Sequence, residues 1–191
     1  MFDPPTDGHL SVIRSLIAVE PKDIWLMPSA KRADKLPFAS NDLRMEMVNR
    51  FLAHFGLTDS ISISGIELES NVPSVTYETN QKLQSIYPER KFRWLIGTDV
   101  AASMHTWGSA QQAINQVPWL IHERPGFESM NQPTDAYALS PQQELVETSS
   151  SMVRDWVSSD KTINKFVCSP VVSVIEDNNL YQYSQSRTNH H

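Results

Sequence analysis

Short apolar runs alternate with helical patterns along most of this chain, and this alternation limits its fold more than any other feature. Each run is too short for a helix and ends near proline, glycine or polar residues, which is typical of a buried strand. Strands alternating with helices predict an α/β fold: a Rossmann-like, doubly wound, mostly parallel sheet with helices on both faces. The predicted strands are residues 23–27, 60–66, 92–97 and 119–122, with a last one at 144–147.

The predicted helices begin beside capping residues and end near glycine or proline. Ser40 or Asn41 can cap the second helix, and Gly56 ends it. Two segments, 28–40 and 127–142, have the composition of loops. The helices are expected at residues 7–20, 41–55, 74–86, 108–116, 149–156 and 170–177.

The length of 191 residues fits one domain with a sizeable core. Hydrophobic residues make up 40% of the chain and charged residues 20%, as in ordinary globular proteins. We expect a single domain spanning residues 1–191, folded over 1–183, with a disordered tail at 184–191. The oligomeric state is left open.

Charge and cysteine content exclude several classes of protein. A formal net charge of −6 argues against a nucleic-acid partner, so any polyanion site must be a local cationic cluster. No apolar run approaches the roughly 18 residues that a membrane span needs, and no basic-then-apolar leader is present. The single Cys168 excludes an internal disulfide framework and a cysteine zinc cage. We therefore expect a cytoplasmic protein without a dedicated metal site.

The first loop, Thr6-Asp7-Gly8-His9, follows two prolines and leads into a helical pattern. Unpaired backbone N–H groups at a helix start attract phosphate, and Gly8 lets a phosphate approach the backbone. Thr6 and His9 are three residues apart, so they share a face if the helix begins near Asp7. The alternative is a helix start capped by Asp7, with His9 on the surface.

A second candidate anion site is the segment 149–154, Ser-Ser-Ser-Met-Val-Arg. Three hydroxyls precede a helix start, and Arg154 adds a forked, permanently charged donor within about a turn. An ordinary serine cap with a surface arginine is the alternative. Two anion sites at helix starts, near opposite ends of one α/β chain, indicate a ligand with several phosphates.

Both segments resemble signatures of one superfamily. Residues 2–10 are similar to the (His/Thr)-x-Gly-His loop of nucleotidyltransferases, and residues 149–154 to their Ser-Ser-(Thr/Ser)-x-x-Arg motif. Within this superfamily the chain is most similar to bacterial nicotinate-nucleotide adenylyltransferases, through segments that occur in order between and after the two motifs. These segments are residues 73–79, 94–99, 106–107, 124–126 and 170–181.

The resemblance implies a reaction in NAD biosynthesis, in which ATP and nicotinic acid mononucleotide give deamido-NAD and pyrophosphate. Mg²⁺ would enter with ATP, held mainly by the phosphates and water. His9 would contact the α-phosphate, and Thr6, where many relatives carry His, would hydrogen-bond the phosphates without adding charge. The remaining phosphate contacts would come from Gly8, Ser149, Ser150, Ser151, Arg154 and a basic loop containing Lys31, Arg32 and Lys35.

The resemblance also implies residues around the nucleosides. Gly97 and Asp99 would border the nucleotides, with Asp99 on a ribose hydroxyl. Trp107 would stack on the nicotinate ring, and the loop around Thr76 would face its carboxylate. Arg44 occupies a position where relatives keep an arginine, and would help bind the mononucleotide. The residues themselves leave other roles open: Trp107 as a buried core residue, Asp99 as a helix cap and the basic loop as solvated surface.

Three alternative functions stay open. Thr6 and the three serines also suit phosphopantetheine adenylyltransferases, and nicotinamide mononucleotide differs from the nicotinate acceptor by one small group. The third alternative is a nucleotide-binding relative without turnover. In relatives an apolar strand precedes the residue matching Phe2 and lies at the centre of the sheet, so we expect Met1 to be an internal methionine or a misassigned start.

Overall fold

The computed structural model describes residues 2–29, 37–69, 74–107, 110–123, 133, 136–139 and 148–182. Within them, five strands form two parallel sheets. One sheet pairs β1 (Ile24–Leu26) with β2 (Ile61–Ile63). The other has the order β3-β4-β5. Its strands are β3 (Trp94–Gly97), β4 (Trp119–His122) and β5 (Tyr137–Leu139).

Helices follow the strands in the alternation that the sequence predicts, which confirms the α/β class. Ser40 caps α2, because its hydroxyl accepts the Leu43 amide at 3.3 Å. Gly56 lies just beyond the end of α2 with a φ of 66°, a left-handed conformation that glycine adopts readily. The helices are α1 (Asp7–Ile17), α2 (Asn41–His54), α3 (Thr76–Ile86), α4 (Thr98–Ser103), the 3₁₀ helix η1 (Met104–Thr106), α5 (Ala110–Gln116), α6 (Ser150–Val157) and α7 (Ser169–Asp177).

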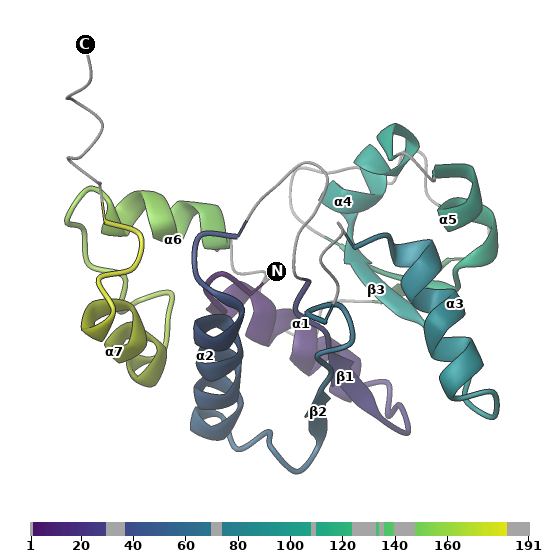
Figure 1. Ribbon diagram of the computed structural model, residues 1–191, viewed down its shortest axis with the longest axis horizontal. Coiled ribbons are helices and arrows are strands. Elements are labelled where there is room, and N and C mark those ends of the chain that lie inside the picture. The colour runs from purple at the N-terminus through teal and green to yellow at the C-terminus, as the bar shows by residue number, and fades with distance from the viewer. Residues whose placement is uncertain are drawn as a thin grey trace.

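The elements gather around two hydrophobic cores. In Figure 1, α2, α6 and α7 lie on one side, and α3, α4 and α5 lie with β3 on the other. The first core joins α1, α2, α6, α7 and the β1–β2 sheet, through buried residues such as Phe51 and Val171. The second is built around Trp119 and Met104. The described part of the chain contains no helix long and apolar enough to cross a membrane.

Side chains, rather than a backbone ladder, bridge the two sheets within the described residues. The ring of Trp25 in β1 contacts Phe92, two residues before β3, at a centroid distance of 5.4 Å. Ser15 of α1 lies 3.3 Å from Nε2 of His122, the last residue of β4. His122 is buried, as expected of a structural histidine. Among the described residues, β1 and β3 are therefore connected through side chains and not through backbone hydrogen bonds.

The secondary structure differs from the sequence analysis at two places. Residues 137–139 form β5, although the segment 127–142 was expected to be a loop. Three residues are too few to show a strand pattern, and pairing with β4 determines their conformation. Residues 98–106 form α4 and η1, which the sequence analysis did not predict. The expected strand at 144–147 and the expected tail at 184–191 lie outside the described residues.

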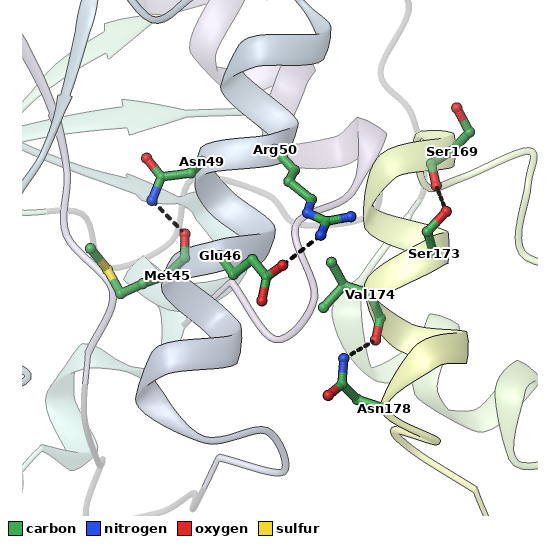
Figure 2. A network of polar contacts seen from close by, with 8 residues as sticks. All are labelled: Met45, Glu46, Asn49, Arg50, Ser169, Ser173, Val174 and Asn178. Atoms are coloured by element: carbon green, nitrogen blue, oxygen red, sulfur yellow. Dashed lines mark hydrogen bonds and ion pairs between the residues drawn. The ribbon is translucent and has the colours of Figure 1, made fainter.

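The packing of α7 against α2 depends on apolar side chains. Figure 2 shows polar contacts on these two helices, and each drawn bond joins residues of the same helix or its cap. Arg50, for example, pairs with Glu46 one turn away at 2.7 Å, and both side chains are more than 40% exposed. Such a pair contributes little, about 0.3–0.5 kcal/mol. Buried residues such as Ile175, only 2% exposed, must therefore supply the stability of this contact.

We expect Ile175→Ala to lower the free energy of unfolding by about 2–4 kcal/mol, because it leaves a cavity in the first core. The matched control is Ile86→Ala, also on a helix but 49% exposed, which should cost less than about 1 kcal/mol. Urea unfolding followed by circular dichroism measures both. Equal losses in the two variants would contradict the assigned core.

Candidate functional site

The two candidate anion-binding segments, about 145 positions apart in sequence, pack directly against each other. The Ser150 hydroxyl donates to the Pro4 carbonyl at 2.8 Å. Arg154 donates from Nη1 to the Asp3 carbonyl at 2.7 Å. The starts of α1 and α6 therefore lie side by side. Because helix starts attract anions, their junction is a candidate anion site.

Gly8 is required by this junction. A Cβ atom at Gly8 would lie 2.5 Å from the carbonyl oxygen of Thr148, which precedes the α6 cap. No real Cβ comes that close to a backbone oxygen, so any side chain here would push the two helix starts apart. The structure thus gives a packing reason for glycine at this position, while the predicted approach of a phosphate to Gly8 stays a prediction.

Thr6 fixes the orientation of His9. The backbone N–H of Thr6 donates to His9 Nδ1 at 3.1 Å, and the Thr6 hydroxyl lies 3.0 Å from the same nitrogen. Because Nδ1 accepts, this hydrogen bonding assigns the proton of the neutral imidazole to Nε2, which becomes a donor. Thr6 itself is fully buried, and its hydroxyl contacts His9 rather than solvent.

Arg154 is held on three sides. Besides the Asp3 carbonyl, its Nη2 donates to the Ser151 hydroxyl at 3.0 Å. Its guanidinium carbon lies 4.5 Å from the centre of the Phe38 ring. Arg154 is only 8% exposed, so the alternative of a surface arginine is wrong. Ser149 does act as an ordinary cap, because its hydroxyl accepts the Met152 amide at 3.1 Å.

Asp3 is a central residue of the site that the sequence analysis missed. Its carboxylate is 1% exposed and accepts the amides of Phe38 at 2.7 Å and Ala39 at 3.2 Å. It also accepts the hydroxyl of Tyr181 at 2.7 Å. Burial and the neighbouring Asp3 charge raise the pKa of Tyr181 far above its usual value, so Tyr181 stays a donor. Both residues lie in segments that carried the resemblance, but sequence alone gave them no partner.

Arg44 is fully buried and bonded to protein atoms. It donates to the Ser29 carbonyl and to the Asn41 side chain, both at 2.6 Å. Burial lowers its pKa, while Asp3 and Tyr181 act in the opposite direction. These contacts attach the segment after β1 to the start of α2. A direct contact between Arg44 and a mononucleotide stays a prediction.

The residues expected around the nucleosides lie in the half of the molecule built on the second core. Gly97 ends β3 and precedes α4, and Asp99 lies in the first turn of α4 rather than at its cap. Thr76 is the first residue of α3. Trp107 follows η1 and packs edge-on against Trp119 at 6.2 Å, half-buried beside the second core. Their predicted contacts with ligands stay predictions.

Lys31, Arg32 and Lys35, the basic loop of the sequence analysis, lie outside the described residues, as does the segment 124–126. Among the residues that the structure describes, no group of three or more His, Cys, Asp or Glu side chains could hold a metal ion. Both side-chain oxygens of Asp3, which lies at the junction, accept hydrogen bonds from protein donors.

We expect Gly8→Ala to destabilise the protein by about 1–3 kcal/mol, because the new methyl group must displace the Thr148 carbonyl. Gly65→Ala is the matched control. A Cβ there meets nothing within 4 Å, so the change in unfolding free energy should stay within about 0.5 kcal/mol. Urea unfolding of both variants checks this. If Gly8→Ala were as stable as Gly65→Ala, the close contact would be refuted.

Comparison with known proteins supports the fold and identifies the family. Residues 1–155 match the model of the cytidylyltransferase-like family. The probable nicotinate-nucleotide adenylyltransferase of Exiguobacterium sibiricum is 30% identical over 187 residues, covering 94% of each chain. That of Shouchella clausii is 30% identical over 183 residues, 94% of this chain and 92% of the relative.

A solved structure shares the fold. The Plasmodium falciparum nicotinic acid mononucleotide adenylyltransferase complexed with NaAD superimposes with a TM-score of 0.83, covering 94% of this chain and 93% of the other at 21% identity. The family model, the curated relatives and the packed pair of motifs agree. The chain therefore belongs to the cytidylyltransferase-like family and, within it, to the nicotinate-nucleotide adenylyltransferases.

Proposed function

We propose that this protein transfers the adenylyl group of ATP to nicotinic acid mononucleotide, giving deamido-NAD and pyrophosphate in NAD biosynthesis. The relatives at 30% identity carry the name of this activity. The observation that carries the proposal is the junction of α1 and α6. His9 lies in the first turn of α1, Ser150 at the start of α6 donates to Pro4, and Arg154 from the last turn of α6 reaches back to the Asp3 carbonyl. Such a junction suits a ligand with adjacent phosphates.

The chemistry needs no covalent enzyme intermediate. The phosphate of the mononucleotide attacks the α-phosphorus of ATP, and pyrophosphate leaves. His9 Nε2–H would donate to the α-phosphate, where negative charge builds up in the transition state. Arg154, with the N–H groups at Ser150 and Ser151, would hold the β- and γ-phosphates. The protein thus positions two anions and neutralises their charge.

The observed contacts refine the role of Thr6. Since its hydroxyl and its N–H both face His9 Nδ1, Thr6 would act by holding the imidazole with Nε2 toward the phosphate. We retain the other expected roles as part of the proposal. Gly8, Ser149, Lys31 and Arg32 would contact the phosphates, and Gly97 and Asp99 would border the nucleotides. Trp107, Thr76 and Arg44 would bind the mononucleotide.

Mg²⁺ would enter as a complex with ATP. Besides the carboxylates of Asp3 and Asp7, the groups at the junction are an imidazole, a guanidinium, hydroxyls and backbone N–H groups, so the junction offers Mg²⁺ no cluster of carboxylates. The carboxylate of Asp3 is already bonded to two amides and a hydroxyl. The phosphates would therefore hold the ion, which would neutralise charge on the leaving pyrophosphate.

We also propose that the protein works in the cytoplasm. Its one cysteine, Cys168, is a buried free thiol, and burial raises its pKa, so it is mainly protonated and unreactive. A protein with this cysteine content suits a reducing compartment.

The proposed function predicts that release of pyrophosphate from ATP requires nicotinic acid mononucleotide. A coupled pyrophosphate assay with three separate acceptors, the nicotinate mononucleotide, the nicotinamide mononucleotide and phosphopantetheine, measures this. His9→Ala should lower kcat about 10²- to 10³-fold, because one preorganised donor to the developing charge is lost. The control, His54→Ala, removes an exposed histidine at the end of α2 and should keep full activity.

The alternatives give different results in the same assay. Turnover with phosphopantetheine alone would identify the other acceptor class. Thermal stabilisation by ATP without pyrophosphate release from any acceptor would indicate a binding protein without turnover. Full activity of His9→Ala would refute the role of His9.

A further inference from the structure

We propose that Tyr181 and Asp3 are positioning residues, which act together as a latch that fastens the end of the described chain to the arginine of the phosphate site. The inference rests on the proposed function, in which Arg154 holds the β- and γ-phosphates of ATP. The latch consists of the Asp3 carboxylate and its three donors, the amides of Phe38 and Ala39 and the hydroxyl of Tyr181.

The latch joins three segments that are far apart in sequence. Tyr181 lies 178 positions from Asp3, and Phe38 lies 35 positions from it. All three meet at a carboxylate that is 1% exposed. A buried carboxylate needs donors, so each of these segments is fixed where its donor reaches Asp3.

The same segments hold the guanidinium of Arg154. Its Nη1 donates to the carbonyl of Asp3 at 2.7 Å, and its central carbon lies 4.5 Å from the centre of the Phe38 ring. The Phe38 ring is 66% exposed, so burial does not hold it in place. Two contacts hold the ring under Arg154. The backbone N–H of Phe38 donates a hydrogen bond to the Asp3 carboxylate, and the Phe38 ring packs edge-on against the Tyr181 ring at 6.5 Å.

The backbone after α7 is bent to reach this contact. Asn179 and Tyr181 both have positive φ angles, 49° and 64°, in the left-handed region that non-glycine residues avoid. Such a conformation costs free energy and persists where other contacts offset it. The Tyr181 hydroxyl bond to Asp3 is a contact of this kind, so the turn after α7 is part of the latch.

Removal of the Tyr181 hydroxyl should loosen Arg154 without removing any atom of it. The Oδ1 atom of Asp3 would keep only the Ala39 amide, at 3.2 Å. Because Arg154 is assigned to the β- and γ-phosphates, the loss should appear in ATP binding. The KM for the mononucleotide, which depends on other groups, should change little.

The test compares Tyr181→Phe with wild type in the full chain. Isothermal calorimetry with ATP alone and steady-state kinetics with both substrates give the Kd and KM for ATP, which we expect to rise roughly three- to tenfold. The matched control is Tyr87→Phe. The Tyr87 ring packs against Trp25 and Phe92, and among the described residues its hydroxyl has no hydrogen bond, so ATP binding should be unchanged.

A second variant, Asp3→Asn, removes the charge but keeps one acceptor oxygen, and it should also weaken ATP binding. Because both variants break one link, the double variant should be no weaker than the more affected single one. A purely structural role would instead lower the melting temperature of Tyr181→Phe and leave the Kd and KM for ATP unchanged. That result, or independent effects of the two substitutions, would overturn the latch.

Failure of the latch is distinguishable from failure of the proposed function. If wild type binds ATP but releases no pyrophosphate with any acceptor, the proposed activity fails, and the calorimetric comparison still decides the latch. If wild type turns over the mononucleotide and Tyr181→Phe matches it in every constant, only the latch fails. A wild type that binds no ATP would overturn both.

Discussion

The site depends on the hydrogen bonds that the buried carboxylate of Asp3 accepts. Almost no solvent reaches it, so its charge is stable only while donors from the protein surround it. Those donors come from the segment before α2 and from the residues after α7, while the carbonyl of the same residue accepts Arg154. One residue thus couples the position of Arg154 to the segment before α2 and to the residues after α7.

The close contact between Gly8 and Thr148 completes this arrangement from the other side. It brings the start of α6 against the start of α1, and the Ser150 bond to Pro4 keeps it there. In the proposed function, the two packed helix starts and Arg154 would attract phosphate through N–H groups and positive charge, without a cage of carboxylates. A chain with a net charge of −6 can therefore carry a polyanion site by concentrating positive potential at one junction.

The sequence predicts those parts of the molecule whose causes are local. The alternation of patterns gives the α/β class, and Ser40 and Gly56 mark the two ends of α2. It does not predict β5, because a three-residue strand is formed by its neighbour β4 rather than by its own pattern. It also cannot reveal the contacts of Asp3, since their partners lie 35 and 178 positions away and only the fold brings them together.

Position 6 of this chain carries threonine, a residue that cannot be positively charged. The resemblance leads one to expect histidine there in many relatives, and threonine supplies no positive charge. In this structure Thr6 is buried and hydrogen-bonds to His9 Nδ1. The loop therefore contains one oriented imidazole, whereas a histidine at position 6 would supply a second. In the proposed reaction, a neutral donor at Nε2 would stabilise developing charge by a hydrogen bond, and permanent positive charge would come from Arg154 and from Mg²⁺ entering with ATP. Arg154 is held by Asp3, Ser151 and Phe38, as expected of a side chain that would supply a fixed positive charge.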